Sequence, residues 1–522
     1  MFNFSELKNH SMKRNSSFLY LLVLLVISQS CKKDLNQGPI NSTYDQEFWT
    51  SKTSAEQGTV AMYGAFRAAI RANKAFFINS EMTSGLFNAT DWNLVSLTKD
   101  GGEKFPVATT NYLGECTDWT RYYKVISQCN TVLDKVAAMP VGLFGDNNKK
   151  NSYIGEALYV RALTYFTMIR IWGDPVYITK TYDNADYGNI PPVARTAETA
   201  VLDTCILDLN KAAGYLSFTG GDPSKTTRAS KGAAYALMAH IYAWQHKYDD
   251  AHKACQQVIN SGGYAMESAA TYANIWQGKS SAESIFEIPM QFNQNDNNFL
   301  NSADGYNDYN DWSEAQFNFF SIFLKDEQVD DLKSTCWLGD TSMIRGIYWY
   351  DNDMRFNNML QYTPASGGDP AGFKLLKYAN FKYQNPSNST NAYVNNNLVL
   401  FRLADIYLLD AEALAMTGKT QDAVDALNLV RRRAGIEDYS GDLDQASLVN
   451  EIMDERGREL IGEGSWFYDM IRTEPVVHAL EGYLGYPADR VTQKGYYWPL
   501  DMGKLFQNDP LLTQNPYWAS HN

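Results

Sequence analysis

The chain has 522 residues, of which 45% are hydrophobic and 20% charged, a composition that supports a large buried core and excludes intrinsic disorder. Its net charge of −14 repels phosphate backbones, which argues against nucleic acid as a partner. Aromatic residues make up 14% of the chain, and many lie in polar stretches where their rings are candidates for contact surfaces.

The amino-terminal residues have the three parts of a secretory signal. Basic residues precede ten apolar residues at 18–27, a run shorter than the roughly 20 residues of a membrane-spanning helix, and small residues lead from it to Cys31. This pattern resembles a bacterial lipoprotein processing site, where the chain is cut before the cysteine and acyl chains are added to it. We predict a signal peptide over residues 1–30, an acylated Cys31 and a polar tether over residues 31–45. The alternative is an ordinary secreted protein with a chance cysteine.

Residues 46–260 are predicted to form an N-terminal helical region, because apolar residues recur there at intervals of three and four. A Gly-, Thr- and Asn-rich stretch at residues 80–118 interrupts this pattern and carries Trp92. The helices are predicted at residues 55–71, 119–139, 152–172, 196–216 and 231–260.

The C-terminal region, residues 261–522, has a different pattern. Residues 283–289 predict a short strand, and long irregular segments continue to residue 397, which usually indicates functional loops. A helical hairpin follows, then one predicted helix at residues 448–472 and a proline-rich tail.

The hairpin at residues 401–433 predicts two antiparallel helices of tetratricopeptide geometry. Small residues on the facing sides allow a close approach, and Gly418 supplies the backbone freedom that ends the first helix. One such pair cannot bury its own apolar face, so several pairs are needed for a continuous core. The arrangement recurs 172 residues upstream, where Ala239, Lys247, Ala251 and Ala254 correspond to Ala411, Lys419, Ala423 and Ala426.

The sequence offers no recognisable catalytic or metal-binding constellation. It has no Gly-x-Ser-x-Gly or His-Glu-x-x-His motif, and none of its cysteines forms a Cys-x-x-Cys pair. Asp454, Glu455 and Glu459 lie among Arg456 and Arg458, a pattern that ion pairs and helix-face solvation explain more simply than acid–base catalysis. We therefore predict no enzyme activity, no metal and no cofactor.

Several blocks, in order along the chain from residue 31 to residue 518, resemble the SusD/RagB family of nutrient-uptake lipoproteins of Bacteroidetes. They include residues 119–130, 161–174, 228–237, 401–433, 455–464 and 498–500. The resemblance implies a mostly α fold, a tetratricopeptide-like superhelix of about four helix pairs with a loop-rich second part containing short strands. It also implies a lipid-anchored, cell-surface protein of the outer membrane, seated on a SusC-like TonB-dependent barrel transporter to which it passes oligosaccharides.

Three alternatives stay open at this point. A peptide-binding member of the same family would have the same shared blocks, because those blocks are structural and do not specify the ligand. A glycoside hydrolase on a helical fold would need two carboxylates about 5 to 9.5 Å apart in an aromatic cleft. A protein-interaction scaffold would use the concave face of its repeats and retain no glycan.

The ligand site is predicted in two polar loops that carry aromatic residues. Sugar rings present flat C–H faces bordered by hydroxyl groups, so a binding site needs exposed aromatic planes beside amides or carboxylates. Trp92 lies in such a loop, and Tyr306, Tyr309 and Trp312 recur every third residue in another. The alternative is that these rings pack the loops onto the superhelix.

Overall fold

The computed structural model describes residues 48–72, 75–88, 114–181, 191–218, 226–277, 281–290, 320, 323, 338–366, 370–385, 390–473, 485–507 and 509–521. The chain separates into two units, residues 1–54 and residues 55–522. The first unit is described from residue 48, where the chain turns and begins helix α3 (Lys52–Arg71). The second unit contains the other described elements, and the predicted boundary between residues 260 and 261 stays a prediction.

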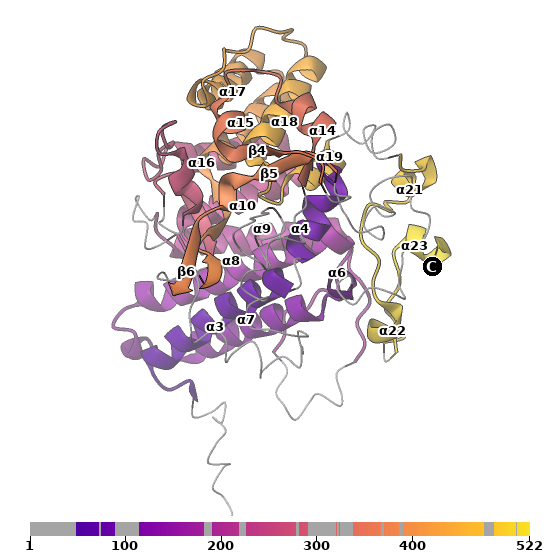
Figure 1. Cartoon of the computed structure of the whole chain (residues 1–522). Coiled ribbons are helices and arrows are strands. Elements are labelled where there is room, and N and C mark those ends of the chain that lie inside the picture. Colours follow the sequence, from indigo (N-terminus) through magenta and orange to yellow (C-terminus); the bar gives the residue numbers. More distant parts are fainter. Residues whose placement is uncertain are drawn as a thin grey trace, which may run out of the picture. The chain divides into compact units, whose positions relative to one another are not determined.

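Helices form most of the second unit, which confirms the predicted mostly α fold (Figure 1). Consecutive helices pack against each other in the order α7, α8, α9, α10, α11, α16, α17 and α18, so that each covers an apolar face of the next. Their bounds are α7 (Thr120–Ala138), α8 (Asn147–Trp172), α9 (Glu198–Tyr215), α10 (Lys231–Trp244), α11 (Tyr248–Ile259), α16 (Leu403–Met416), α17 (Thr420–Ala434) and α18 (Gln445–Leu460).

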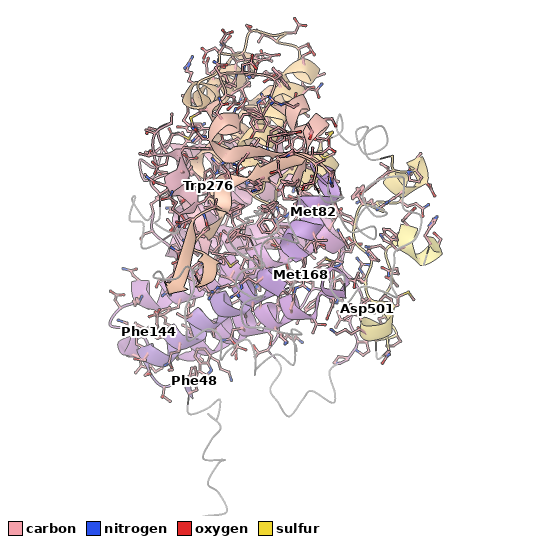
Figure 2. All side chains as sticks on the ribbon, in the orientation of Figure 1. Phe48, Met82, Phe144, Met168, Trp276 and Asp501 are labelled. Carbon is pink, nitrogen blue, oxygen red and sulfur yellow. The ribbon has the colours of Figure 1, made fainter. Side chains whose placement is uncertain are left out.

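Helix α8 has the longest continuous run of buried residues among these helices. Every residue from 155 to 169 is buried, and Met168, labelled in Figure 2, lies among the surrounding helices. The helix begins where the Asp146 side chain accepts a hydrogen bond from the Lys149 N–H at 2.8 Å. It ends at Gly173, whose φ of +72° few other residues adopt without strain.

The predicted repeat is confirmed at the level of backbone conformation. In the second hairpin Gly418 has a φ of +78°, and the Lys419 N–H donates to the Leu414 carbonyl at 2.9 Å. At the equivalent positions of the first hairpin, His246 has a φ of +56° and the Lys247 N–H donates to the Tyr242 carbonyl at 2.8 Å. Two turns 172 residues apart in sequence therefore have the same geometry.

In the described part of the chain the strands lie in three antiparallel sheets, with orders β1-β3-β5-β4, β2-β8 and β6-β7. Strand β2 confirms the predicted strand. Figure 1 shows β4 and β5 close to α14, α15 and α18. The packing agrees with this view, because α15 contacts β4 and α14 contacts both β5 and α18. The strands are β1 (Phe87–Asn88), β2 (Ser284–Pro289), β3 (Leu338–Asp340), β4 (Leu360–Thr363), β5 (Gly372–Leu375), β6 (Phe381–Asn385), β7 (Thr390–Val394) and β8 (Asn397–Arg402).

Short helices connect these sheets to the helical array. They are α4 (Ala75–Ser80), α6 (Gly114–Thr117), α14 (Thr341–Ile347), α15 (Met354–Met359), α19 (Trp466–Arg472), α21 (Ala488–Thr492), α22 (Met502–Leu505) and α23 (Pro516–His521). Single turns of 3-10 helix lie at Met82–Ser84, Val141–Leu143, Tyr272–Trp276 and Leu376–Tyr378. No helix among the described residues is long and apolar enough to cross a membrane.

Two predictions about the C-terminal region are wrong. The helix predicted at residues 448–472 is two helices, α18 and α19, because Gly462 and Gly464 have φ values of +78° and +81° that stop an α-helix between them. The stretch predicted as irregular up to residue 397 contains α14, α15 and most of the strands. Its short strands lack the long apolar alternation that indicates a strand in sequence.

Candidate ligand-binding site

The pairing of β1 with β3 brings together the two parts of the chain that hold the predicted aromatic loops. Phe87 and Asn88 lie opposite Gly339 and Leu338, and the Asp340 N–H donates to the Leu86 carbonyl at 2.8 Å. The chain leaves β1 into the segment that contains Trp92, and it enters β3 from the segment that follows Trp312. The two segments therefore meet the sheet at the same place.

A cluster of buried aromatic rings lies beneath this junction. Phe323 contacts Phe77 and Phe87 with ring centroids 4.8 and 5.0 Å away. Phe320 stacks on Tyr378 at 4.4 Å, and the Phe323 carbonyl accepts a hydrogen bond from the Leu375 N–H at 3.3 Å. Such ring pairs stabilise packing beyond the area that they bury. Phe320 and Phe323, which follow the segment that contains Trp312, are thus packed against the residues around β1.

The predicted site residues themselves cannot be tested by these contacts. Trp92, Tyr306, Tyr309 and Trp312 lie outside the described residues, as does the predicted acylation site Cys31. Their roles stay predictions.

The structure adds two exposed aromatic residues that the sequence analysis missed. Trp349 is 46% exposed and Tyr362 54% exposed. One side of Trp349 is held by the Arg458 guanidinium, 4.5 Å from the ring centroid, and Arg458 donates to Glu455 at 2.7 Å. Residues 348–353 combine rings with Asp and Asn just as the two predicted loops do, so the same compositional signal could have identified Trp349.

Glu81 lies between the 3-10 turn at Met82–Ser84 and the loop that separates α18 from α19. Its Oε1 accepts a hydrogen bond from the Gly464 N–H at 2.6 Å, whereas Oε2 has no partner among the described residues. Burial raises the pKa of Glu81 to about 7, although the N–H groups of Gly464 and Gly462 and the charge of Lys377 lower it. Glu81 therefore titrates near neutral pH at the base of the segment that leads to β1.

Two carboxylates of α18, Glu455 and Glu459, are unsuited to acid–base catalysis on a large substrate. Glu455 and Glu459 are fully buried and both bind Arg355, at 2.6 and 3.0 Å. Burial alone would raise the pKa of Glu459, but Arg433, Arg402 and Arg355 hold it well below its ordinary value. The ion-pair interpretation is correct for these residues. The suggestion that a solvated helix face explains them is wrong, because they lie in the interior.

These ion pairs belong to a connected buried network, which we call the α18 network. Among the described residues it has equal numbers of basic and acidic side chains, so charge is balanced without solvent. Its members are Arg355, Lys377, Arg402, Arg431, Arg433 and Arg458 with Glu283, Asp353, Glu451, Glu455, Glu459 and Glu463.

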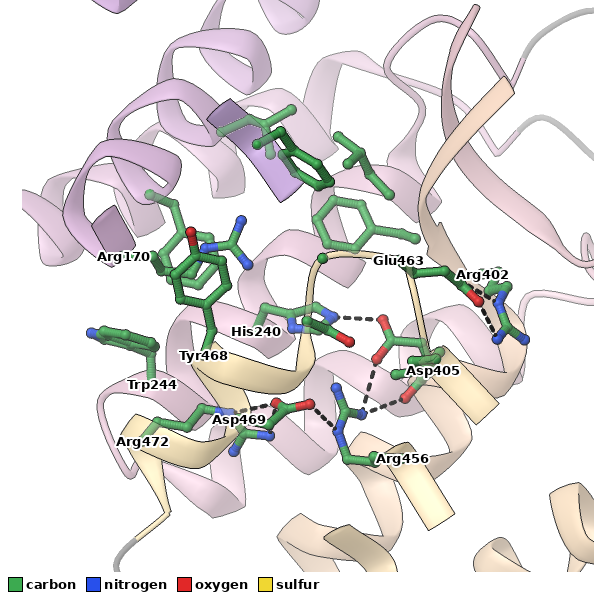
Figure 3. Close-up of a pocket in the computed structure, with 18 residues that line it drawn as sticks. Arg170, His240, Trp244, Arg402, Asp405, Arg456, Glu463, Tyr468, Asp469 and Arg472 are labelled. Carbon is green, nitrogen blue, oxygen red and sulfur yellow. Dashed lines mark hydrogen bonds and ion pairs between the residues drawn. The ribbon is translucent and has the colours of Figure 1, made fainter. Parts of the chain in front are cut away.

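A pocket lies beside the network, between α8, α10, β8, α16 and α19 (Figure 3). Its volume of about 40 Å³ is far below the several hundred Å³ of a typical ligand site, so it does not admit a sugar ring. The labelled walls include Arg170, His240, Asp405, Arg456 and Asp469. Within the described residues, no group of His, Cys, Asp and Glu side chains has the arrangement of a metal site.

Two family models match this sequence. A model described as "SusD family" matches residues 268–518, and a model described as "Starch-binding associating with outer membrane" matches residues 36–243. "SusD-like protein P38" of Formosa agariphila is 25% identical over 548 residues, which cover 97% of this chain and 99% of that protein. "Starch-binding protein SusD" of Bacteroides thetaiotaomicron is 32% identical over 110 residues, 21% of this chain and 19% of that protein.

Solved structures with similar folds cover nearly the same residues. A SusD homolog from Bacteroides thetaiotaomicron superposes with a TM-score of 0.71 and 24% identity, over 90% of this chain and 99% of that one. A structure described as "Laminarin binding SusD-like protein" superposes with a TM-score of 0.68 and 23% identity, over 90% of this chain and 99% of that one. Both likenesses confirm the tetratricopeptide-like helical fold.

Proposed function

Because the chain belongs to the SusD/RagB family, we propose that it is a lipid-anchored protein of the outer membrane that captures oligosaccharides at the cell surface. It passes them to a SusC-like TonB-dependent barrel transporter. Its role is binding, without turnover of the glycan. The names of its relatives support a carbohydrate ligand, since one family model is described as starch-binding and one similar structure as laminarin-binding.

The pairing of β1 with β3 is the observation that supports the proposed position of the binding site. Trp92 follows Asn88 by four residues, and four residues of extended chain span at most about 14 Å. The segment that contains Tyr306, Tyr309 and Trp312 is followed by the buried Phe320 and Phe323, of which Phe323 packs on Phe87 of β1 and both contact Phe77. Trp312 precedes Phe320 by eight residues, which span at most about 29 Å of extended chain. This arrangement supports one composite site formed by the two loops.

Retention on polysaccharides tests the proposed function. Native gels that contain laminarin, starch or other soluble polysaccharides should slow the purified protein on at least one polymer, with bovine serum albumin as the reference for mobility. Reducing ends should not increase when that polymer is incubated with the protein, whereas a glycoside hydrolase would release them. Retention by no polysaccharide, together with binding of a peptide library, would assign the chain to the peptide-binding alternative.

The transporter partnership needs its own experiment. Affinity purification of a tagged full-length protein from detergent-solubilised membranes should recover a TonB-dependent barrel in comparable amount. A second purification, from cells in which the gene of the recovered barrel has been deleted, controls for adventitious capture. Recovery of soluble periplasmic proteins alone would contradict the partnership.

A further inference from the structure

The pocket in Figure 3 is lined by four arginine residues, of which three have carboxylate partners. Arg402 binds Glu459 at 2.6 Å and Glu463 at 2.8 Å. Arg456 binds Asp469 at 2.8 Å and Asp405 at 2.9 Å, and Arg472 binds Asp469 at 2.6 Å. Burial alone would lower the pKa of each guanidinium. Asp469 and Asp405 nevertheless raise the pKa of Arg456 above its ordinary value, and Glu412 and Asp469, which both pair with Arg472, raise the pKa of Arg472 well above it. Both cations are fully compensated.

Arg170 differs from these three residues. Its guanidinium lies over the rings of Phe166 and Tyr468, 4.6 Å from each centroid, and Figure 3 shows it directed toward the middle of the pocket. No acceptor among the described residues lies within hydrogen-bond distance of its buried Nε. Burial lowers the pKa of Arg170 from its ordinary value. Tyr468 and Asp469 oppose this effect electrostatically, without a hydrogen bond to the guanidinium. Its positive charge lacks a direct partner.

The acids of the pocket are not available to Arg170. Asp405 accepts from His240 at 2.7 Å and pairs with Arg456, and Asp469 is held by Arg456 and Arg472. Three further atoms of the walls, Arg456 Nη2, Ser465 Oγ and Asp405 Oδ1, are buried without a hydrogen-bond partner. Asp405 Oδ1 is an acceptor, but it already lies 2.9 Å from Arg456 Nη1 in an ion pair. The other groups left over, Arg170 Nε, Arg456 Nη2 and the Ser465 hydroxyl, can all donate. A water molecule would need acceptors as well, whereas an anion accepts only.

We propose that this pocket binds a small monovalent anion of the size of chloride, held by the N–H groups of Arg170. A volume of about 40 Å³ accommodates an ion or roughly three water molecules, and it excludes a sugar or a peptide side chain of any length. The bound anion supplies the counter-charge that a partly buried guanidinium requires. The ion also ties α8, which carries Arg170, to α19, which carries Tyr468.

Bromide diffraction tests the site directly. Crystals of the full mature protein soaked in sodium bromide should give an anomalous difference peak in the pocket, within hydrogen-bond distance of Arg170. The peak should be absent from Arg170→Gln crystals and unchanged in Arg432→Gln, whose guanidinium is exposed and pairs with Asp438. A wild-type pocket that contains only water, with no anomalous signal, overturns the proposal even if the Arg170→Gln protein fails to fold.

Melting temperature provides a second readout in solution. At equal ionic strength, chloride should raise the melting temperature by a few degrees over gluconate, an anion too large for the pocket, because only the folded protein binds the ion. The difference should vanish in Arg170→Gln and persist in Arg432→Gln. Equal melting temperatures of the wild-type protein in the two salts would also overturn the proposal.

Discussion

Glu81 is a single residue whose burial has a measurable effect on stability. Its pKa is about 7 in the folded protein and 4.5 for an ordinary glutamate. Because the folded-state pKa is raised, the protonated form is favoured by folding. Stability is therefore unaffected below about pH 4.5, falls as the pH rises toward 7, and is constant above that, with a total loss on the order of 3 kcal/mol.

The first prediction follows from this titration. Replacing Glu81 by Gln removes the carboxyl group that loses its proton. The free energy of unfolding of Glu81→Gln minus that of the wild type should therefore increase by up to about 3 kcal/mol between pH 4.5 and pH 7. Urea unfolding across this range measures it. Asp442→Asn, in an exposed turn, is the control and should keep the wild-type pH dependence. Parallel stability curves for Glu81→Gln and the wild type would show that Glu81 does not titrate there.

The second prediction concerns the tryptophans of the two predicted loops. Trp92→Ala and Trp312→Ala should each weaken glycan binding by about 1 to 3 kcal/mol, because each removes a stacking plane. Calorimetry on the polysaccharide that the protein retains measures the loss, and the melting temperature should not change.

Trp349→Ala is the matched control for these two variants, because Trp349 is exposed but packs on Arg458 away from both loops in sequence. Its affinity for the glycan should equal that of the wild type. If Trp349→Ala weakens binding while the other two variants do not, the site lies at Trp349.

At the scale of whole elements, the sequence predicts what depends on local periodicity. The helices of the array and both hairpin turns follow from apolar residues at three- and four-residue spacing and from Gly418. The break between α18 and α19 requires knowing that Gly462 and Gly464 adopt positive φ, which Glu81, distant in sequence, helps to fix through the Gly464 N–H. Pairing of β1 with β3 depends on contacts across 250 residues and has no local signal.

The interior of α18 shows the other limit of sequence reasoning. Its Glu and Arg residues have the spacing of a solvated helix face, and only the partners supplied by other elements reveal that they are buried. Arg355 precedes β4, and Arg402 ends β8. Ion pairs between separate elements therefore have no signal in the local sequence. The pocket in Figure 3, which is formed by side chains of several elements, has none either.

The third prediction tests the α18 network. Glu459→Gln removes a carboxylate that binds Arg355, Arg402 and Arg433, and it leaves buried guanidinium groups without a full counter-charge. We expect a loss of about 3 to 5 kcal/mol in the free energy of unfolding. Asp438→Asn, which breaks the exposed pair with Arg432, should cost less than about 1 kcal/mol. Similar losses in both variants would show that burial does not strengthen the network.

At the scale of the whole molecule, function depends on where the protein is held. The family model described as associating with the outer membrane matches residues 36–243, which begin just after the predicted acylation site. The polar composition of residues 31–45 suits a tether that lets the folded part reach a membrane transporter. Anchoring and ligand binding are then separable properties of one chain.

The fourth prediction separates them. Cys31→Ala should release the protein from the outer membrane, because each acyl CH₂ that enters the bilayer contributes about 0.8 kcal/mol and the variant has no acyl chains. Fractionation in high salt, in cells without the partner transporter, measures the effect free of protein–protein retention. Ser42→Ala, in the same predicted tether, should stay in the membrane fraction. Purified Cys31→Ala should bind polysaccharide as the wild type does, since the proposed site residues are distant in sequence from Cys31. Membrane retention of Cys31→Ala under these conditions would mean that another part of the chain anchors it.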